Sequence, residues 1–221
     1  MNWMKKVAVA LVCLLPLGLQ AAKVDTLQVK SPSMNKSIEV VVVSPDVAAT
    51  KACPVIYLLH GYGGNARTWV GIKPDLSKIA DEKGIFFVCP DGKNTWYWDS
   101  PLNADVRYET FISDELVKYV DSHYKTVADR KGRAITGLSM GGHGAMWNGL
   151  RHSDVFSAAG STSGGVDIRP FPKNWEMSVQ IGEKAKYPEN WEKYTVINLV
   201  PTLRKDQIAL IFDCGDSDFF L

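Results

Sequence analysis

The sequence predicts an α/β fold with a mostly parallel central sheet and helices on both faces. Short apolar runs recur along the chain, and several are continuous rather than alternating, as in strands that are covered on both sides. Amphipathic stretches separate these runs, and the order strand, helix, strand favours parallel pairing. The predicted strands are 38–43, 55–59, 85–89, 133–138, 155–159 and 207–213, and the predicted helices are about 72–82, 108–122 and 140–151.

Each predicted element has its own pattern. The strands include IEVVVV at 38–43, VIYLL at 55–59 and IFFVC at 85–89, all rich in β-branched or aromatic residues. Within 108–122, the segment FISDELVKYV places apolar residues three and four apart, which is the period of a helix. The run RAITGL at 133–138 leads directly into the amphipathic stretch 140–151.

Composition sets limits on the class of protein. A chain of 221 residues with 46% hydrophobic and 22% charged residues suits one globular domain. Lys and Arg number 25 against 24 Asp and Glu, so there is no basic field to attract nucleic acid. The charge therefore indicates no macromolecular partner.

The first residues are typical of a secretory signal peptide. MNWMKK is a short basic start, VAVALVCLLPLGL is an apolar run of 13, and QAA is a small-residue cleavage site. The apolar run is shorter than the roughly 20 residues that cross a bilayer as a helix, so we expect no stable membrane anchor. We therefore expect a signal peptide at 1–22, one domain at 23–221, and a secreted or periplasmic protein.

Three cysteines follow the signal peptide: Cys53, Cys89 and Cys214. Each lies beside a strongly apolar run, which favours buried reduced thiols, and none has the spacing of a metal site. A bridge between Cys89 and Cys214 is the alternative, since both would end neighbouring parallel strands and the protein would be in an oxidising compartment.

One long region interrupts the alternation of strands and helices. Residues 164–200 hold three prolines together with Trp175 and Trp191. Such an insertion after a strand is either a lid or wall of a substrate site or a packed surface excursion with no substrate role.

Ser139 is the candidate nucleophile. It lies in GLSMG, after the strand-like RAIT and at the start of a helix, which is the context of a G-x-S-x-G nucleophile turn. Gly137 and Gly141 leave space for the turn, and the helix that begins at Met140 directs unpaired N–H groups at the same point. A structural serine in a tight turn is the alternative.

A glycine-rich loop supports the same chemistry. LLHGYGG at 58–64 follows another strand, and such a loop can bring a backbone N–H to an oxyanion. Tyr62 is the predicted donor from this loop and Met140 the donor from the helix. The alternative is a generic glycine-rich turn between strand and helix.

The chain resembles the esterase D family of α/β-hydrolases, which includes S-formylglutathione hydrolase, tributyrin and feruloyl esterases, and the mycolyltransferases. The stretches LLHGYGG, VCPDGKNTWYWDSP, YETFISDELVKYVDSHY and GRAITGLSMGGHGAMWNGLRHSDVFSAAGSTSG carry the resemblance in order and spacing. It implies Ser139 as nucleophile, the N–H groups of Tyr62 and Met140 as the oxyanion hole, and Asp218 as the acid, with Asp213 as the alternative. It implies no metal and no organic cofactor.

The catalytic histidine is the difficulty. In this fold it follows the acid, but the chain has four histidines, all before Asp218, and ends three residues after it. We interpret all four as structural, with His60, His143 and Trp98 as pocket-lining candidates. We therefore expect a C-terminally incomplete domain that lacks the final strand and helix of the fold, with impaired activity and marginal stability.

The predicted function is an exported serine carboxylesterase that acts through an acyl-enzyme on a small-molecule or carbohydrate-linked ester. Short-chain acyl groups, or acetyl and feruloyl groups on carbohydrate, are the expected substrates, with the aromatics of NTWYWDSP stacking on them or packing in the core. The alternatives are an acyltransferase of the mycolyltransferase type and a noncatalytic remnant. The sequence does not indicate an oligomeric state.

Overall fold

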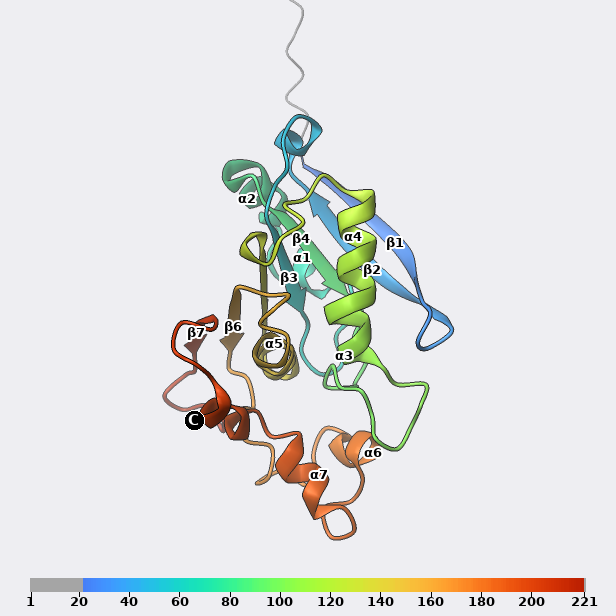
Figure 1. The fold of residues 1–221 in the computed structure, drawn as a ribbon, viewed down its shortest axis with the longest axis vertical. Coiled ribbons are helices and arrows are strands. Elements are labelled where there is room, and N and C mark those ends of the chain that lie inside the picture. Colours follow the sequence, from blue (N-terminus) through green and yellow to red (C-terminus); the bar gives the residue numbers. More distant parts are fainter. Residues whose placement is uncertain (1–21, 221) are drawn as a thin grey trace, which may run out of the picture.

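A computed structural model describes residues 22–220, and its central sheet confirms the predicted fold class. Seven strands lie in the order β1-β2-β4-β3-β5-β6-β7 (Figure 1). The pairs from β4 to β7 are parallel, whereas β1 and β2 join antiparallel. The strands are β1 Lys23–Ser31, β2 Lys36–Ser44, β3 Val55–Leu59, β4 Phe86–Pro90, β5 Arg133–Gly137, β6 Ala158–Thr162 and β7 Ala209–Asp213.

Two strands differ most from the sequence prediction, and the bounds of the others agree with it to within two residues. β1 was not predicted, because its residues alternate with many exposed side chains and form no continuous apolar run. β6 begins at Ala158 rather than at residue 155, because the N–H groups of Val155 and Phe156 both donate to the carbonyl of His152. This turn holds Phe156 in the core beneath the sheet instead of in the strand. The predicted signal peptide, except Ala22, lies outside the described residues.

Helices cover both faces of the sheet. The helices α4 and α5 pack on one face, while α1 and α2 pack on the other against residues of β2, β3 and β4 (Figure 1). The helical elements are η1 Asp46–Ala49, α1 Thr68–Ile72, α2 Leu76–Lys83, α3 Tyr108–Thr110, the π-helical turn η2 Phe111–Glu115, α4 Leu116–His123, η3 Arg130–Gly132, α5 Met140–Arg151, α6 Met177–Ile181, α7 Pro188–Lys193 and η4 Val196–Thr202.

The predicted helix at 72–82 is wrong in its extent, because two helices occupy this region. Pro74 follows Lys73, whose φ of −127° and ψ of 74° end α1. Proline disfavours the helical conformation of the preceding residue and supplies no N–H, so the chain restarts as α2. The helix predicted at 108–122 is α3, η2 and α4 in direct succession.

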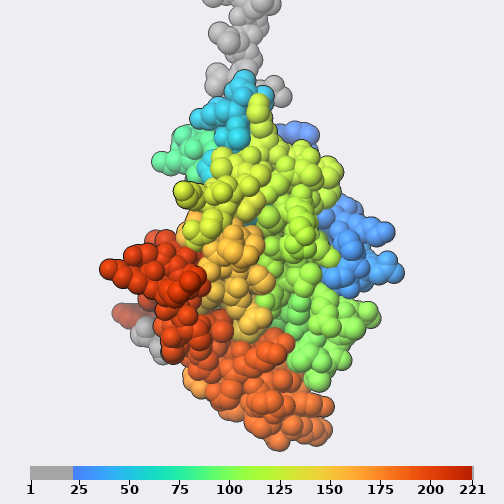
Figure 2. Space-filling model, in the orientation of Figure 1, coloured from blue at the N-terminus to red at the C-terminus, as the bar shows by residue number. Residues whose placement is uncertain are grey.

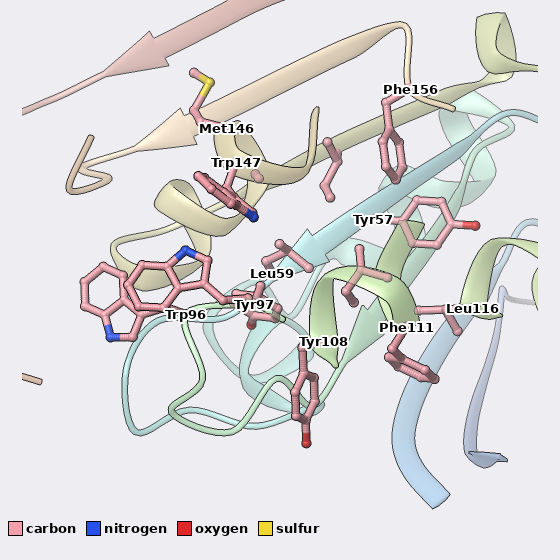
Figure 3. Close-up of a cluster of buried hydrophobic side chains, with 14 of the residues drawn as sticks. Tyr57, Leu59, Trp96, Tyr97, Tyr108, Phe111, Leu116, Met146, Trp147 and Phe156 are labelled. Carbon is pink, nitrogen blue, oxygen red and sulfur yellow. The ribbon is translucent and has the colours of Figure 1, made fainter. Parts of the chain in front are cut away.

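The larger core lies between the sheet, α4 and α5. Tyr57 of β3 meets Phe156 edge to face at 5.7 Å, and Trp96 and Tyr97 lie in the same core as Trp147 of α5 (Figure 3). Removing each such side chain from water stabilises the fold by roughly 1.5–3 kcal/mol. This layer holds the helix that begins at the candidate nucleophile.

Residues 164–200 form an insert that holds α6, α7 and most of η4. It lies beyond the carboxyl ends of the parallel strands (Figure 1). On the surface it adjoins the C-terminal segment, residues 214–220 (Figure 2). Trp191 is buried in the insert and donates from Nε1 to the carbonyl of Gly182 at 2.9 Å. Phe171 and Trp175 contact Phe219 and Phe220 of the C-terminal segment.

The strand order excludes the alternative disulfide. Cys89 lies in β4 and Cys214 follows β7, so three strands stand between them, which corresponds to roughly 19 Å at a spacing of about 4.8 Å. The Cα atoms of a disulfide lie less than about 7 Å apart, so this pair cannot bond. Cys53 and Cys89 are buried free thiols, as the sequence favours, and Cys214 is free and half-buried.

The sheet ends at β7 in the described part of the chain, and this strand is exposed. Ile211 is 76% and Phe212 74% exposed on opposite faces. Beneath β7, apolar side chains of α5, η4 and the strand line a groove of about 310 Å³. No helix within residues 22–220 is long and apolar enough to cross a membrane.

Candidate active site

Ser139 occupies a sharp turn between β5 and α5. Its φ of 53° and ψ of −119° are unfavourable for a residue with a side chain, so the surrounding bonds must hold the turn. The N–H of Ser139 donates to the carbonyl of Thr162 on β6 at 2.9 Å, and its own carbonyl accepts from the N–H of His143 at 3.0 Å. Neighbouring strand and helix thus fix the serine, which is partly exposed.

Gly137 and Gly141 of GLSMG have to be glycine because other backbone atoms lie too close for a side chain. A Cβ on Gly137 would lie 2.3 Å from the carbonyl oxygen of Gly141, and one on Gly141 would lie 2.1 Å from the carbonyl oxygen of Leu59. Both contacts are with backbone atoms, which cannot rotate away as side chains do. The pattern therefore lets α5 begin directly against the end of β3.

The loop after β3 reaches the same point. A Cβ on Gly61 would lie 3.5 Å from the Cβ of Ser139, so the loop passes beside the serine. Within residues 22–220, neither the N–H of Tyr62 nor that of Met140 has an acceptor. Unpaired N–H groups near a partly exposed hydroxyl are suited to stabilise a developing oxyanion. The structure thus places the loop of Tyr62 beside Ser139 and Met140 at the start of the adjoining helix, and their role as an oxyanion hole stays a prediction.

The two candidate acids lie at and beyond the end of β7. Asp213 is exposed, and its carbonyl accepts from the N–H of Ser163, while its strand partner is Thr162. Asp218 is half-buried, and its Oδ1 accepts from the N–H of Phe220 at 2.9 Å. Neither carboxylate contacts Ser139 or a histidine among the described residues.

His60 is a buried structural residue rather than an open pocket wall. The N–H of Gly92 donates to Nε2 at 2.9 Å, so the proton is on Nδ1, which donates to the carbonyl of Gly61 at 2.7 Å. Because Nε2 accepts, its 3.6 Å approach to Asp91 is not an ion pair. The ring fixes the start of the loop that carries Tyr62.

Both ring nitrogens of His143 are also engaged in hydrogen bonds. Trp98 Nε1 donates to its Nε2 at 3.0 Å, so Nδ1 carries the proton and donates to the carbonyl of Gly165 at 2.8 Å. Burial lowers the pKa of His143 to about 4, against the opposing effect of the bond to Gly165. The ring is therefore neutral near pH 7 and has no free nitrogen for a serine proton.

The other two histidines lie in separate contacts. His123 stacks on Tyr119 at 4.0 Å, and its Nδ1 approaches the carbonyl of Tyr119. His152 contacts Glu109, a buried carboxylate that also accepts from Arg151 and Trp147. No hydrogen bond joins any of the four imidazole rings to the hydroxyl of Ser139, so the described residues supply no base to it.

The expectation that Trp98 lines a pocket is wrong. Trp98 is 0% exposed, stacks on Trp96 at 5.6 Å and forms part of the core. The N–H of its indole needs an acceptor in the interior, and His143 supplies one. The aromatics of NTWYWDSP are thus packing residues, whereas Trp175 of the insert remains partly exposed.

Sequence reasoning missed Asn94 and Glu176, which connect the loop of Tyr62 to the insert. The side chain of Asn94 bonds to both Gly63 and Glu176, and Glu176 lies 82 residues away along the chain. No local pattern encodes a contact of that length. No group of three His, Cys, Asp or Glu residues that could hold a metal occurs within residues 22–220.

Comparison with known proteins gives consistent matches. The Esterase family model matches residues 31–221. The chain is 31% identical over 149 residues to Esterase Rv1288 of Mycobacterium tuberculosis (64% of this chain, 32% of that protein). It is 31% identical over 102 residues to an acetyl esterase of Caldicellulosiruptor saccharolyticus (46% and 37%). It thus spans about a third of the length of these two relatives. A solved ferulic acid esterase superposes with a TM-score of 0.72 at 30% identity, covering 91% of this chain and 82% of that one.

The glycine contacts predict that a Gly→Ala substitution changes the free energy of unfolding very differently at Gly141 and at Gly71. Gly141→Ala should lower the free energy of unfolding by about 3 kcal/mol, because its Cβ would overlap backbone carbonyls of β3 and the loop. Gly71→Ala in α1 is the matched control, since nothing lies within 4 Å of its Cβ position. It should be neutral or stabilising by up to about 1 kcal/mol. Urea unfolding would measure both, and equal stabilities would contradict the packing described.

Burial of neutral His143 predicts a loss of stability in mild acid. Below the ordinary histidine pKa of about 6.5, His143 binds a proton in the unfolded chain. In the folded protein the ring stays neutral down to about pH 4. The free energy of unfolding should therefore fall by up to roughly 1.4 kcal/mol per pH unit across this window. Urea unfolding at pH 7 and pH 5 should show a smaller fall for His143→Gln than for wild type. The exposed His123→Gln control should keep the wild-type fall, and an unchanged fall in His143→Gln would refute this origin.

Proposed function

Because the chain belongs to the Esterase family of α/β-hydrolases, we propose that it is an exported serine carboxylesterase that works through an acyl-enzyme on Ser139. The observation that carries this proposal is the turn at Ser139, where a partly exposed hydroxyl lies beside the loop of Tyr62 and at the start of α5. The family model spans residues 31–221, in agreement with the resemblance read from the sequence.

The proposed reaction uses these groups in sequence. Ser139 Oγ attacks the ester carbonyl, and the N–H groups of Tyr62 and Met140 stabilise the charge that develops on the carbonyl oxygen. The alcohol then leaves, and water releases the acid from the serine. Asp218 is the proposed orienting carboxylate, since it is more buried than Asp213 and its position is fixed by the N–H of Phe220.

The groups named so far do not include an acceptor for the hydroxyl proton of Ser139. The ring nitrogens of His60 and His143 are engaged, and His123 and His152 lie in other contacts. We propose that an imidazole other than these four serves as the base. The same observation favours a second candidate, a noncatalytic protein that binds esters without turning them over.

Acetyl or feruloyl esters on carbohydrate are the proposed substrates. Support comes from the similarity to an acetyl esterase and to a solved ferulic acid esterase. Within the structure, Trp175 is a partly exposed aromatic of the insert beyond the strand ends, where it could stack on a ring. The signal-like residues 1–22 support export.

Chemical rescue tests the proposed function. Free imidazole should accelerate p-nitrophenyl acetate hydrolysis by the chain beyond the rate that imidazole gives alone, because it can take the serine proton. A fluorophosphonate should label Ser139, as peptide mass spectrometry would show. Without a positioned base, residual catalysis of up to about a thousandfold over water is the expected scale.

Ser139→Ala is the control for both measurements and should show neither label nor rescue. Equal imidazole-dependent rates for wild type and Ser139→Ala, with no label at Ser139, would favour the noncatalytic candidate. Comparing p-nitrophenyl acetate with acetylated and feruloylated oligosaccharides would then test the substrate class. No preference for the saccharide esters would refute that part of the proposal.

A further inference from the structure

We propose that Asn94 and Glu176 are positioning residues that hold the oxyanion loop, so that the insert acts on the active site through the peptide of Tyr62. The inference rests on the proposed function, in which the N–H of Tyr62 stabilises the oxyanion. In this proposal the insert positions a backbone N–H of the active site, whereas a lid would cover the substrate and a packed surface excursion would do neither.

Asn94 fixes the residue that follows Tyr62. The N–H of Gly63 donates to Asn94 Oδ1 at 2.9 Å. A backbone N–H can only donate, so the amide oxygen must face it, and this orientation turns Nδ2 toward the insert. Gly63 has a φ of 76°, a conformation that suits glycine and that the bond to Asn94 helps to select.

Glu176 completes the bridge from the insert. Asn94 Nδ2 donates to Glu176 Oε2 at 3.1 Å. Glu176 and the preceding Trp175 have φ values of 53° and 47°, so two residues with side chains share a left-handed conformation. Such a pair costs energy and persists only where other contacts hold it.

A buried tryptophan supplies one such contact. Trp96 Nε1 donates to the carbonyl of Trp175 at 3.0 Å, and Trp96 is 1% exposed. The backbone that presents Glu176 is therefore tied to the core two residues after Asn94 in sequence. Segment 94–96 therefore holds the insert twice, through Asn94 at the Glu176 side chain and through Trp96 at the Trp175 carbonyl.

The loop is held on both sides of Tyr62, and the bond from Gly63 to Asn94 fixes the residue after it. Desolvation of the phenol and the Glu176 carboxylate raise the pKa of Tyr62. On the other side of the loop, His60 Nδ1 donates to the carbonyl of Gly61. The residues before and after Tyr62 are therefore both fixed, which sets the direction of its N–H.

The consequence for catalysis is a requirement for alignment. An oxyanion donor contributes only when it points to the place where the oxygen charge develops, and a displacement of about 1 Å can cost roughly a hundredfold in rate. Loss of either bridging side chain should release Gly63 and let the peptide of Tyr62 rotate. Substrate binding would change little, because neither side chain needs to contact the substrate.

Kinetics of fluorophosphonate labelling at Ser139 test this role, because the phosphoryl oxygen develops charge as the serine attacks. Asn94→Ala and Glu176→Ala should lower the maximal labelling rate constant roughly tenfold or more, with an unchanged half-saturating probe concentration. Glu176→Gln should stay within about twofold of wild type, since its amide oxygen can accept the same bond. Glu183→Ala, which removes another exposed carboxylate of the insert, is the matched control and should label as wild type.

Hydrogen exchange of peptides covering residues 58–69 separates this inference from the proposed function. These peptides should exchange faster in Asn94→Ala and Glu176→Ala than in wild type, Glu176→Gln or Glu183→Ala. Equal exchange in all five proteins would overturn the bridge, and faster exchange with unchanged labelling kinetics would overturn its positioning role. A wild type that is never labelled, with exchange that still depends on Asn94, would refute the serine chemistry and leave the bridge in place.

Discussion

The close approach of α5 to the end of β3 is the constraint on which the rest of the site depends. The backbone of Gly141 meets the carbonyl of Leu59 so closely that no side chain fits between them. This approach forces the chain to reverse direction at Ser139, at the cost of a positive φ. Without it, Ser139 would not lie beside the loop after β3.

Buried neutral histidines help the protein to maintain this strained geometry. His60 bonds to the loop after β3 and to Gly92, while His143 joins α5 to Trp98 and to Gly165. In each ring one nitrogen donates and the other accepts, so both are satisfied without charge. An imidazole that has two structural bonds cannot also exchange a proton with substrate, which is why proximity to Ser139 does not make either ring a base.

Local signals predicted much of the fold and the centre of the site. The continuous apolar run of residues 55–59 predicted the bounds of β3, and the GLSMG pattern predicted the turn between β5 and α5 at Ser139, because both depend on neighbours in sequence. The sequence did not reveal β1, whose exposed residues lack an apolar run, or the interruption of the helix at Pro74. The prediction that Trp98 lines a pocket was wrong, because the sequence alone does not distinguish a tryptophan packed in the core from one exposed in a pocket.

Contacts between distant residues explain what the sequence could not supply. Asn94 and Glu176 are ordinary polar residues in their own segments, and their importance arises only when the insert folds back over the loop after β3. The strained pair at Trp175 and Glu176 is informative for this reason, because an isolated surface excursion would gain nothing from it. The strained backbone at Trp175 and Glu176 thus places one carboxylate of the insert within hydrogen-bonding distance of Asn94, which also bonds to the loop after β3.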